Sequence, residues 1–289
     1  MRFAFVAEKA ELGVARLCRS LGVSRSGFYA WKLRPQSAHD IVDERLKARV
    51  HEAHRIGRRY YGSPRVYRAL KRQGIRVSKK RVVRLMQEEG LVGRPTHKFK
   101  FNTTDSDHGL PVATNILDRK FTAEAPNQRW VGDTTELIIP NGRLFLAVII
   151  DLFSRFVVGW ALSTVNDRHL TLKALDMALR RRCPGAGLLH HSDQGSTYAS
   201  EDYQDVLAKH GITCSMSRRG NCYDNAAMES WNSTLKSELG ERFENPADAK
   251  EKLFDYIEVF YNQMRMHSSL DYMSPAEFER AAHSLKRAA

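Results

Sequence analysis

The sequence predicts an α/β protein in which small all-helical units precede a larger domain built on a mixed β-sheet. Three observations support this fold class: positive charge gathers in the first 120 residues, helical segments there turn at glycines, and strand patterns replace helical ones after residue 125. The 289 residues are enough for two domains of about 100–200 residues each, or for one domain with appendages.

We expect no membrane segment, secretion signal or disulfide framework. The longest apolar stretch, Leu144 to Ile150, has seven residues, against the roughly 20 that a membrane-spanning helix needs. Glu8, Lys9 and Glu11 lie where a signal peptide would be apolar. The four cysteines form no CxxC pair and show no zinc-ligand spacing, which is typical of reduced thiols in a cytoplasmic protein.

Charge is distributed unevenly along the chain. Residues 1–120 hold 27 Lys and Arg against 11 Asp and Glu, whereas residues 121–289 hold 19 against 22. A basic front half joined to a slightly acidic rear half indicates nucleic-acid binding, because phosphates are neutralised by Lys and Arg gathered together. The alternative is a merely solubilising surface, but solubility does not require charge on one side only.

The first unit, residues 1–36, is predicted to contain a helix-turn-helix. In the stretch VARLCRSLGVSRSGFYAWKL (14–33), Gly22 falls at the corner and Ser24 is placed to cap the second helix. Arg25 and Ser26 would then face DNA. A purely structural helical hairpin remains the alternative, because any short hairpin with glycine at its corner has this pattern.

The second helical unit, residues 37–92, is also predicted to bind DNA. A long helix around residues 41–54 ends at Gly57, a second helix ends at Gly74, and a third begins at Ser78. The basic residues expected to stay exposed on this third helix are Lys79, Lys80, Arg81 and Arg84. Residues 93–123, which are polar and punctuated by Gly and Pro, are predicted to form a linker.

The order of strands and helices in the rear half predicts a ribonuclease-H-like mixed sheet. Three strands at about 130–139, 143–151 and 155–162 come first, with Asn141-Gly142 as the hairpin turn between the first two. Helix and strand then alternate, with helices at 167–182, 201–210 and 225–239 and strands at 188–193 and 212–217. We assign residues 124–240 to this catalytic core and residues 241–289 to a C-terminal helical extension.

Three acids stand out as candidate catalytic and metal-binding residues. Asp133 lies inside the first strand, Asp193 ends a later strand, and Glu229 follows on a helix after 35 intervening residues. Carboxylates that converge from two strands and one covering helix can hold two Mg²⁺ ions, for which Mn²⁺ substitutes, and so promote an in-line phosphodiester displacement. Taken singly, each acid would more often be a surface group.

Basic and imidazole side chains flank these acids. Lys236 lies seven residues after Glu229, hence on nearly the same helix face, from which it would reach bound DNA. The alternative is a solvated lysine paired with Glu238 or Glu241. His190 and His191 precede Asp193, and a core or positioning role is expected for both.

Four segments together resemble one family, the OrfB-type chains of insertion-sequence transposases whose two overlapping reading frames are joined by programmed frameshifting. The matching segments are NILDRKFTAEAPNQRWVGDTTEL (115–137), HSDQGSTY (191–198), DNAAMESWNSTLKSE (224–238) and the tail YNQMRMHSSLDYMSPAEF (261–278). The resemblance maps the family's Asp-Asp-Glu triad onto Asp133, Asp193 and Glu229, and its following lysine onto Lys236. Met266 departs from the proline often found at that position.

The resemblance implies a retroviral-integrase-like core that cuts and joins DNA in the presence of Mg²⁺. It also implies double-stranded DNA partners (the element's terminal inverted repeats and the target), a homo-oligomer on DNA, an upstream OrfA segment as fusion or partner, and a nucleoid-associated place in a bacterial cell. A catalytically inert DNA-binding regulator and a ribonuclease-H-like nuclease or resolvase are the alternatives. Intact carboxylates argue against the first, and two helical units with the tail signature argue against the second.

Overall fold

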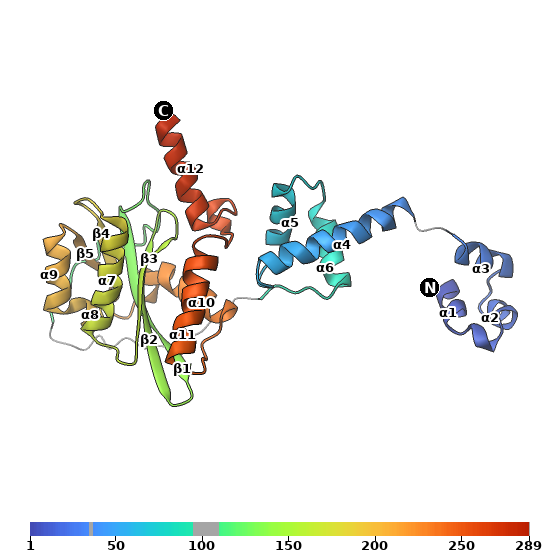
Figure 1. The fold of residues 1–289 in the computed structure, drawn as a ribbon, viewed down its shortest axis with the longest axis horizontal. Helices are drawn as coiled ribbons and strands as arrows, with labels where there is room; N and C mark the ends of the chain where they lie inside the picture. The colour runs from blue at the N-terminus through green and yellow to red at the C-terminus, as the bar shows by residue number, and fades with distance from the viewer. Residues whose placement is uncertain (35–36, 95–109, 289) are drawn as a thin grey trace.

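The computed structural model describes residues 1–34, 37–94 and 110–288 (Figure 1). The predicted linker, residues 93–123, therefore lies partly outside the described residues, as does the end of the first predicted unit. Across the described ranges, no helix combines the length and the apolar character needed to cross a membrane.

The first unit is a small helical cluster that contains the two helices and the glycine turn predicted for residues 14–33. It consists of α1 (Arg2–Glu8), α2 (Val14–Ser20) and α3 (Arg25–Lys32), with a short 3₁₀ turn between α1 and α2. Gly22 turns the corner at a φ of +62°, and Ser24 caps α3 by accepting a hydrogen bond from the Gly27 N–H at 2.9 Å. A core of its own, built on Val6, Cys18 and Phe28, holds the three helices together.

The second unit packs a long helix across a shorter pair. Its elements are α4 (Ala38–Ile56), α5 (Ser63–Arg72) and α6 (Lys79–Glu88). Ser37 and Asp40 form a capping box that starts α4, and Ser78 caps α6 by accepting from the Arg81 N–H at 3.2 Å. Buried aliphatic side chains on all three helices, such as Val50, Leu70 and Leu85, form the interior.

A five-stranded mixed sheet forms the centre of the rear half. Its strands are β1 (Arg129–Ile139), β2 (Gly142–Asp151), β3 (Val157–Ser163), β4 (Leu189–Ser192) and β5 (Thr213–Met216), in the order β3-β2-β1-β4-β5. The first three strands pair antiparallel, whereas β4 runs parallel to β1 and β5 runs parallel to β4. This is the predicted ribonuclease-H-like topology, in which β1 occupies the central position.

The β1–β2 turn lies one residue earlier than predicted. Ile139 pairs with Gly142, so Pro140 and Asn141 form the two-residue turn and Gly142 already belongs to β2. Proline suits a turn position because its φ is preset and it has no N–H to contribute to a strand ladder.

Helices cover both faces of the sheet (Figure 1). One face carries α7 (Arg168–Arg182), α8 (Ser196–Ala199) and α9 (Glu201–Lys209), which enclose a compact apolar core. The backbone of α7 approaches β3 so closely that a Cβ on Gly159 would lie 2.2 Å from the Ala174 carbonyl oxygen. This close approach requires a glycine at position 159.

The opposite face carries the helix that bears Glu229, together with the C-terminal elements. These are η2 (Cys222–Asn225), α10 (Ala226–Glu238), α11 (Pro246–Phe254), the π-helical η3 (Asp255–Tyr261), the 3₁₀ turn η4 (Ser268–Leu270) and α12 (Pro275–Ala288). The apolar core on this side continues into the interior of the α4–α6 unit. The second helical unit therefore packs directly against the C-terminal part of the chain.

Candidate active site and nucleic-acid interface

Asp133 and Asp193 lie on neighbouring strands of the sheet. The parallel register pairs Arg129 with Leu189 and Val131 with His191, and the same offset of 60 residues brings Asp133 alongside Asp193 just past the end of β4. Adjacent strands are about 4.8 Å apart. Two carboxylates therefore emerge at neighbouring positions on the central pair of strands.

Glu229 contributes a third negative charge from α10, which packs on β1. Asn232, one turn after Glu229, donates its side-chain N–H to Asp133 Oδ2 at 2.8 Å. Burial first, then the charge of Asp193 and more weakly that of Glu229, raise the pKa of Asp133 well above its usual value. The Asn232 contact fixes how α10 lies over Asp133. The sequence analysis did not single out Asn232, because the only signal for this residue is its spacing of three from Glu229.

The three carboxylates form an electronegative site without a preformed metal cage. Asp133 and Asp193 are half-buried, whereas Glu229 is exposed in the first turn of α10. Among the described residues, no three His, Cys, Asp or Glu side chains stand close enough together to hold a metal ion. The donor set nevertheless fits a hard divalent cation, because carboxylate oxygens are the ligands that such ions prefer and a cation would relieve the repulsion that raises the pKa of Asp133.

The two histidines before Asp193 belong to the core. His190 contacts the Tyr203 hydroxyl at 3.0 Å, and burial lowers its pKa to about 3. Burial likewise lowers the pKa of His191 to about 4, and its two ring nitrogens contact the hydroxyls of Ser215 and Ser217 at 2.9 and 3.1 Å. Both rings are therefore neutral near pH 7 and engaged with hydroxyls of the core.

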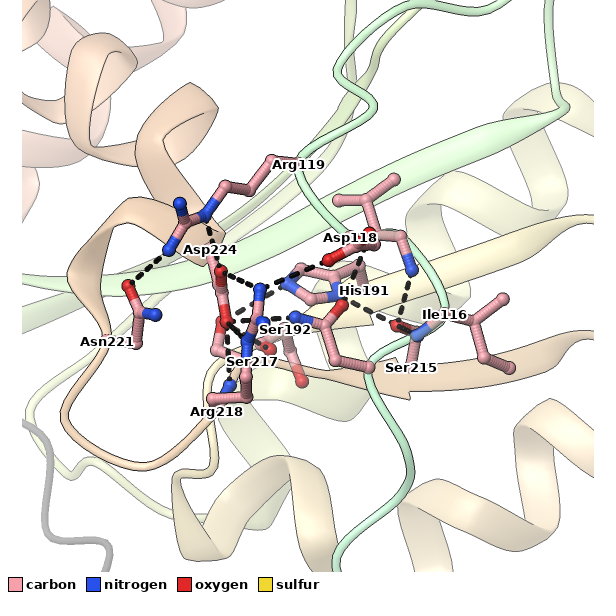
Figure 2. Close-up of polar contacts among 12 residues, drawn as sticks. Ile116, Asp118, Arg119, His191, Ser192, Ser215, Ser217, Arg218, Asn221 and Asp224 are labelled. Carbon is pink, nitrogen blue, oxygen red and sulfur yellow. Dashed lines mark hydrogen bonds and ion pairs between the residues drawn. The ribbon is translucent and has the colours of Figure 1, made fainter.

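A charged cluster anchors the segment from which α10 begins (Figure 2). Asp224 is fully buried and accepts hydrogen bonds from Arg218 Nε at 2.7 Å and from Arg119 Nε at 2.9 Å. Hydrogen bonds from Arg218 are the main reason why the pKa of Asp224 lies well below its usual range. Asp224 is five residues before Glu229, so this cluster fixes the start of the helix that carries the third carboxylate.

The same cluster reaches back to the segment before β1. Asn115 donates to Asp224 Oδ2 at 2.9 Å, and the Ile116 N–H donates to the Ser215 hydroxyl at 2.9 Å. Ser215 also contacts His191, so the segments around β1, β4, β5 and α10 meet at one place. No sequence periodicity marks this role, because its partners are about 100 residues apart.

Lys236 pairs with Glu241, one of the two partners that the sequence left open for it, but it is not a solvated lysine. Its ammonium nitrogen lies 3.6 Å from Glu241 Oε2, and its side chain is 10% exposed. The lysine lies on nearly the same face of α10 as Glu229, but it is already paired within the protein.

The predicted DNA-contacting residues divide into exposed and internally paired groups. Arg25 and Ser26 on α3, and Lys79 and Lys80 at the start of α6, are exposed. In contrast, Arg81 and Arg84 both pair with Asp43 of α4. Arg81 Nε lies 2.6 Å from Asp43 Oδ1, and Arg84 NH2 lies 2.5 Å from Asp43 Oδ2. Arg81 is also half-buried, not exposed as predicted, because this ion pair draws it against α4.

Several further arginines of the basic half point toward the rear half. Arg58 forms a two-pronged ion pair with Asp255, and Arg65 Nε donates to the Met266 carbonyl oxygen at 3.0 Å. Arg94 donates to the carbonyl oxygen of Glu238 at 2.9 Å, at the end of α10. Part of the positive charge that the composition assigned to DNA therefore docks the second helical unit onto the rear domain.

Comparisons with known families agree with this architecture. Residues 42–99 match the HTH-like domain family, residues 123–222 match the integrase core domain family, and residues 210–275 match a second integrase core domain family. The integrase core places the chain in the class of DDE polynucleotidyl transferases, enzymes that cleave and join DNA strands.

Two curated relatives cover nearly the whole chain. The insertion element IS600 31 kDa protein of Shigella sonnei is 44% identical over 271 residues, covering 93% of this chain and 99% of the relative. The transposase InsF for insertion sequence IS3A of Escherichia coli K12 is 38% identical over 284 residues, covering 96% and 98%. The chain belongs to the IS3 family of insertion-sequence transposases, which confirms the resemblance seen in the sequence.

The solved structures that the chain matches are more distant in sequence. A simian T-cell lymphotropic virus intasome in complex with PP2A regulatory subunit B56 gamma has a TM-score of 0.47 at 16% identity, covering 73% of this chain and 69% of that one. The HTLV-2 integrase catalytic core domain in complex with magnesium has a TM-score of 0.41 at 18% identity, covering 54% and 98%.

Proposed function

We propose that Asp133, Asp193 and Glu229 are the catalytic carboxylates of this transposase and together bind two Mg²⁺ ions. The observation that carries the proposal is that Asp133 and Asp193 emerge side by side from parallel strands while the charge of Glu229 acts on Asp133. Carboxylates brought together in this way favour a divalent cation with oxygen ligands. Mn²⁺ is expected to substitute for Mg²⁺.

Each residue of the site has a distinct task in this proposal. Asp133 and Asp193 hold fixed positions on the sheet, Glu229 completes the site by turning inward from α10, and Asn232 keeps α10 aligned with Asp133. Bound metal ions supply activation of the attacking oxygen and stabilisation of the leaving oxygen in a phosphodiester displacement. The protein contributes positioning and electrostatics, so no covalent link between protein and DNA is needed.

We further propose that the DNA partners are the element's terminal inverted repeats and the target duplex. Arg25, Ser26, Lys79 and Lys80 are exposed on the two helical units and are the DNA contacts that we favour. An upstream OrfA segment, as fusion or partner, and a homo-oligomer assembled on DNA follow from the family resemblance.

A strand-cleavage assay tests the assignment of the triad. Purified protein is incubated with labelled element ends in Mg²⁺ or in EDTA, alone and with the OrfA segment supplied. Nicking and joining should require Mg²⁺ and vanish in Glu229→Gln, while DNA binding persists. Glu201→Gln, which neutralises an exposed glutamate in the first turn of α9, serves as the matched control and should retain activity. Full activity of Glu229→Gln would overturn the assignment.

A further inference from the structure

A cavity of about 410 Å³ lies against the flank of α10 turned away from Asp133. Its walls include Ser230 and Trp231 of α10 and His267 and Ser269 of the tail. Successive helical residues are rotated by about 100°, so the residues of α10 that line the cavity point away from the face that holds Glu229 and Asn232. The cavity is therefore separate from the carboxylate site, although Ser230 directly follows Glu229.

Three arginines line this cavity, and we call it the arginine pocket after Arg65, Arg155 and Arg265. Arg265 makes a buried two-pronged ion pair with Glu238, whose Oε2 accepts from Nε at 2.8 Å and Oε1 from NH2 at 2.7 Å. Arg65 lies 3.8 Å from that same carboxylate. Glu238 thus already serves two guanidinium groups.

Arg155 adds a third positive charge with no counter-charge. It donates to the Phe121 carbonyl oxygen at 3.0 Å, and among the described residues no carboxylate pairs with it. It also adopts a left-handed backbone conformation with a φ of +62°, which costs energy for a residue other than glycine or asparagine. An arginine that lines a cavity with no carboxylate partner among the described residues is a costly arrangement unless a ligand supplies the negative charge.

The remaining polar groups of the pocket do not compensate this charge. Burial and the positive charges of Arg265, Arg65 and Arg155 hold the pKa of His267 well below its usual value, so the ring stays neutral. Ser230, Thr234, Ser268 and Ser269 line the pocket with hydroxyls. The buried indole N–H of Trp231 has no hydrogen-bond partner among the described residues. The pocket thus offers many donors and a net positive charge.

We propose that the arginine pocket is a binding site for a phosphate group. Guanidinium forks and hydroxyls match the oxygens of a phosphate, and the volume lies within the range of about 300–1,000 Å³ typical of small-ligand sites. The phosphate would come from the backbone of a DNA strand or from a free phosphate or nucleotide. The site itself does not depend on the proposed catalytic triad; only the DNA source rests on the proposed function.

Fluorescence of Trp231 provides a direct test. The full chain is titrated with inorganic phosphate, and Trp231→Phe identifies the part of the signal that comes from the pocket. Arg155→Asn removes the charge with a residue that tolerates the left-handed backbone, and we expect phosphate binding to weaken at least about tenfold, while Arg155→Lys keeps most of the affinity. Arg143→Gln, which neutralises an exposed arginine on the β1–β2 hairpin, is the matched control and should bind like the original protein.

A competition arm distinguishes the two sources of phosphate. It uses Glu229→Gln protein without metal, so a failure of the catalytic assignment cannot affect the result. Displacement of phosphate by a short duplex at constant ionic strength assigns the pocket to a DNA backbone phosphate, whereas unchanged phosphate binding with saturating DNA assigns it to a free phosphate or nucleotide. The proposal is overturned if the original protein shows no saturable signal, or if folded Arg155→Asn, checked by circular dichroism, binds phosphate equally well.

Discussion

Replacing Asp224 by Asn tests whether the buried charged cluster holds the start of α10. Asp224 has no exposed surface and accepts three hydrogen bonds from Arg218, through the backbone N–H at 3.0 Å, Nε at 2.7 Å and NH2 at 2.9 Å. Arg119 and Asn115 donate two more. The substitution leaves two guanidinium groups facing a neutral amide at almost unchanged volume.

The expected loss of stability follows from the burial of each partner. Removing one partner of a fully buried ion pair costs about 3–5 kcal/mol. The side chains of Arg119 and Arg218 are 49% and 52% exposed, so water takes over part of their solvation and we expect about 2–4 kcal/mol. Because the pKa of Asp224 is lowered in the folded state, its contribution is fully present above the unfolded value of about 3.9 and is lost as the pH falls further.

Urea denaturation at pH 7, followed by circular dichroism, measures the free energy of unfolding of Asp224→Asn. Asp118→Asn is the matched control, because this 62% exposed carboxylate also contacts Arg218, at 3.2 Å, and should change stability by less than about 0.5 kcal/mol. We also expect Mg²⁺-dependent strand cleavage to slow, because α10 carries Glu229. A loss for Asp224→Asn no larger than that of the control would refute the reasoning.

Three further predictions concern stability and pH. Asp133→Asn should raise the melting temperature of the metal-free protein at pH 7 while abolishing cleavage, because a carboxyl with a raised folded-state pKa destabilises the fold once the pH exceeds its unfolded value; a lower melting temperature would contradict this. Because the folded His191 ring stays neutral while the unfolded one gains a proton, the free energy of unfolding should fall by about 2 kcal/mol between pH 6.5 and 5. His191→Asn should remove this fall, and an unchanged pH dependence in urea titrations would contradict the prediction. Tyr61→Phe should cost about 1–2 kcal/mol in urea denaturation, because the hydroxyl accepts from the Met266 N–H at 2.9 Å and donates to the Met264 carbonyl oxygen at 3.1 Å; no measurable loss would rule out this docking contact.

The sequence predicted the sheet because its strands differ clearly from their surroundings. Apolar residues marked the first three strands, with Asn141-Gly142 between the first two, and the order of strands and helices then left few topologies. The β1–β2 turn was placed one residue late because Asn-Gly is the stronger local signal, whereas pairing of Ile139 with Gly142 settled the register. Local signals fix which elements exist better than they fix where each one ends.

The candidate site was only partly predictable from the sequence. Strand positions sufficed to single out Asp133 and Asp193, because an acid within or just after a buried strand is unusual. The contacts of Asn232 with Asp133, and of Asp224 with Arg119, join residues about 100 positions apart, which no local pattern reveals. The tail offers a similar case.

Met266 departs from the proline often found in the family, and no partner for it could be predicted from the sequence. The Met266 N–H instead donates to the Tyr61 hydroxyl of the second helical unit, a bond that proline could not make. The composition likewise showed that the front half has an excess of basic residues, but it did not show what these side chains contact. Arg58 and Arg65 contact the rear domain. Both outcomes depend on tertiary packing.

Locating Mn²⁺ by anomalous scattering in crystals of the protein with an element end tests the central claim most directly. We predict two peaks about 3.5–4 Å apart, held by Asp133, Asp193 and an inward-turned Glu229, with the second peak missing in Glu229→Gln. Metal bound elsewhere, or a Glu229 side chain that stays at the surface while both peaks persist in Glu229→Gln, would contradict the three-carboxylate site.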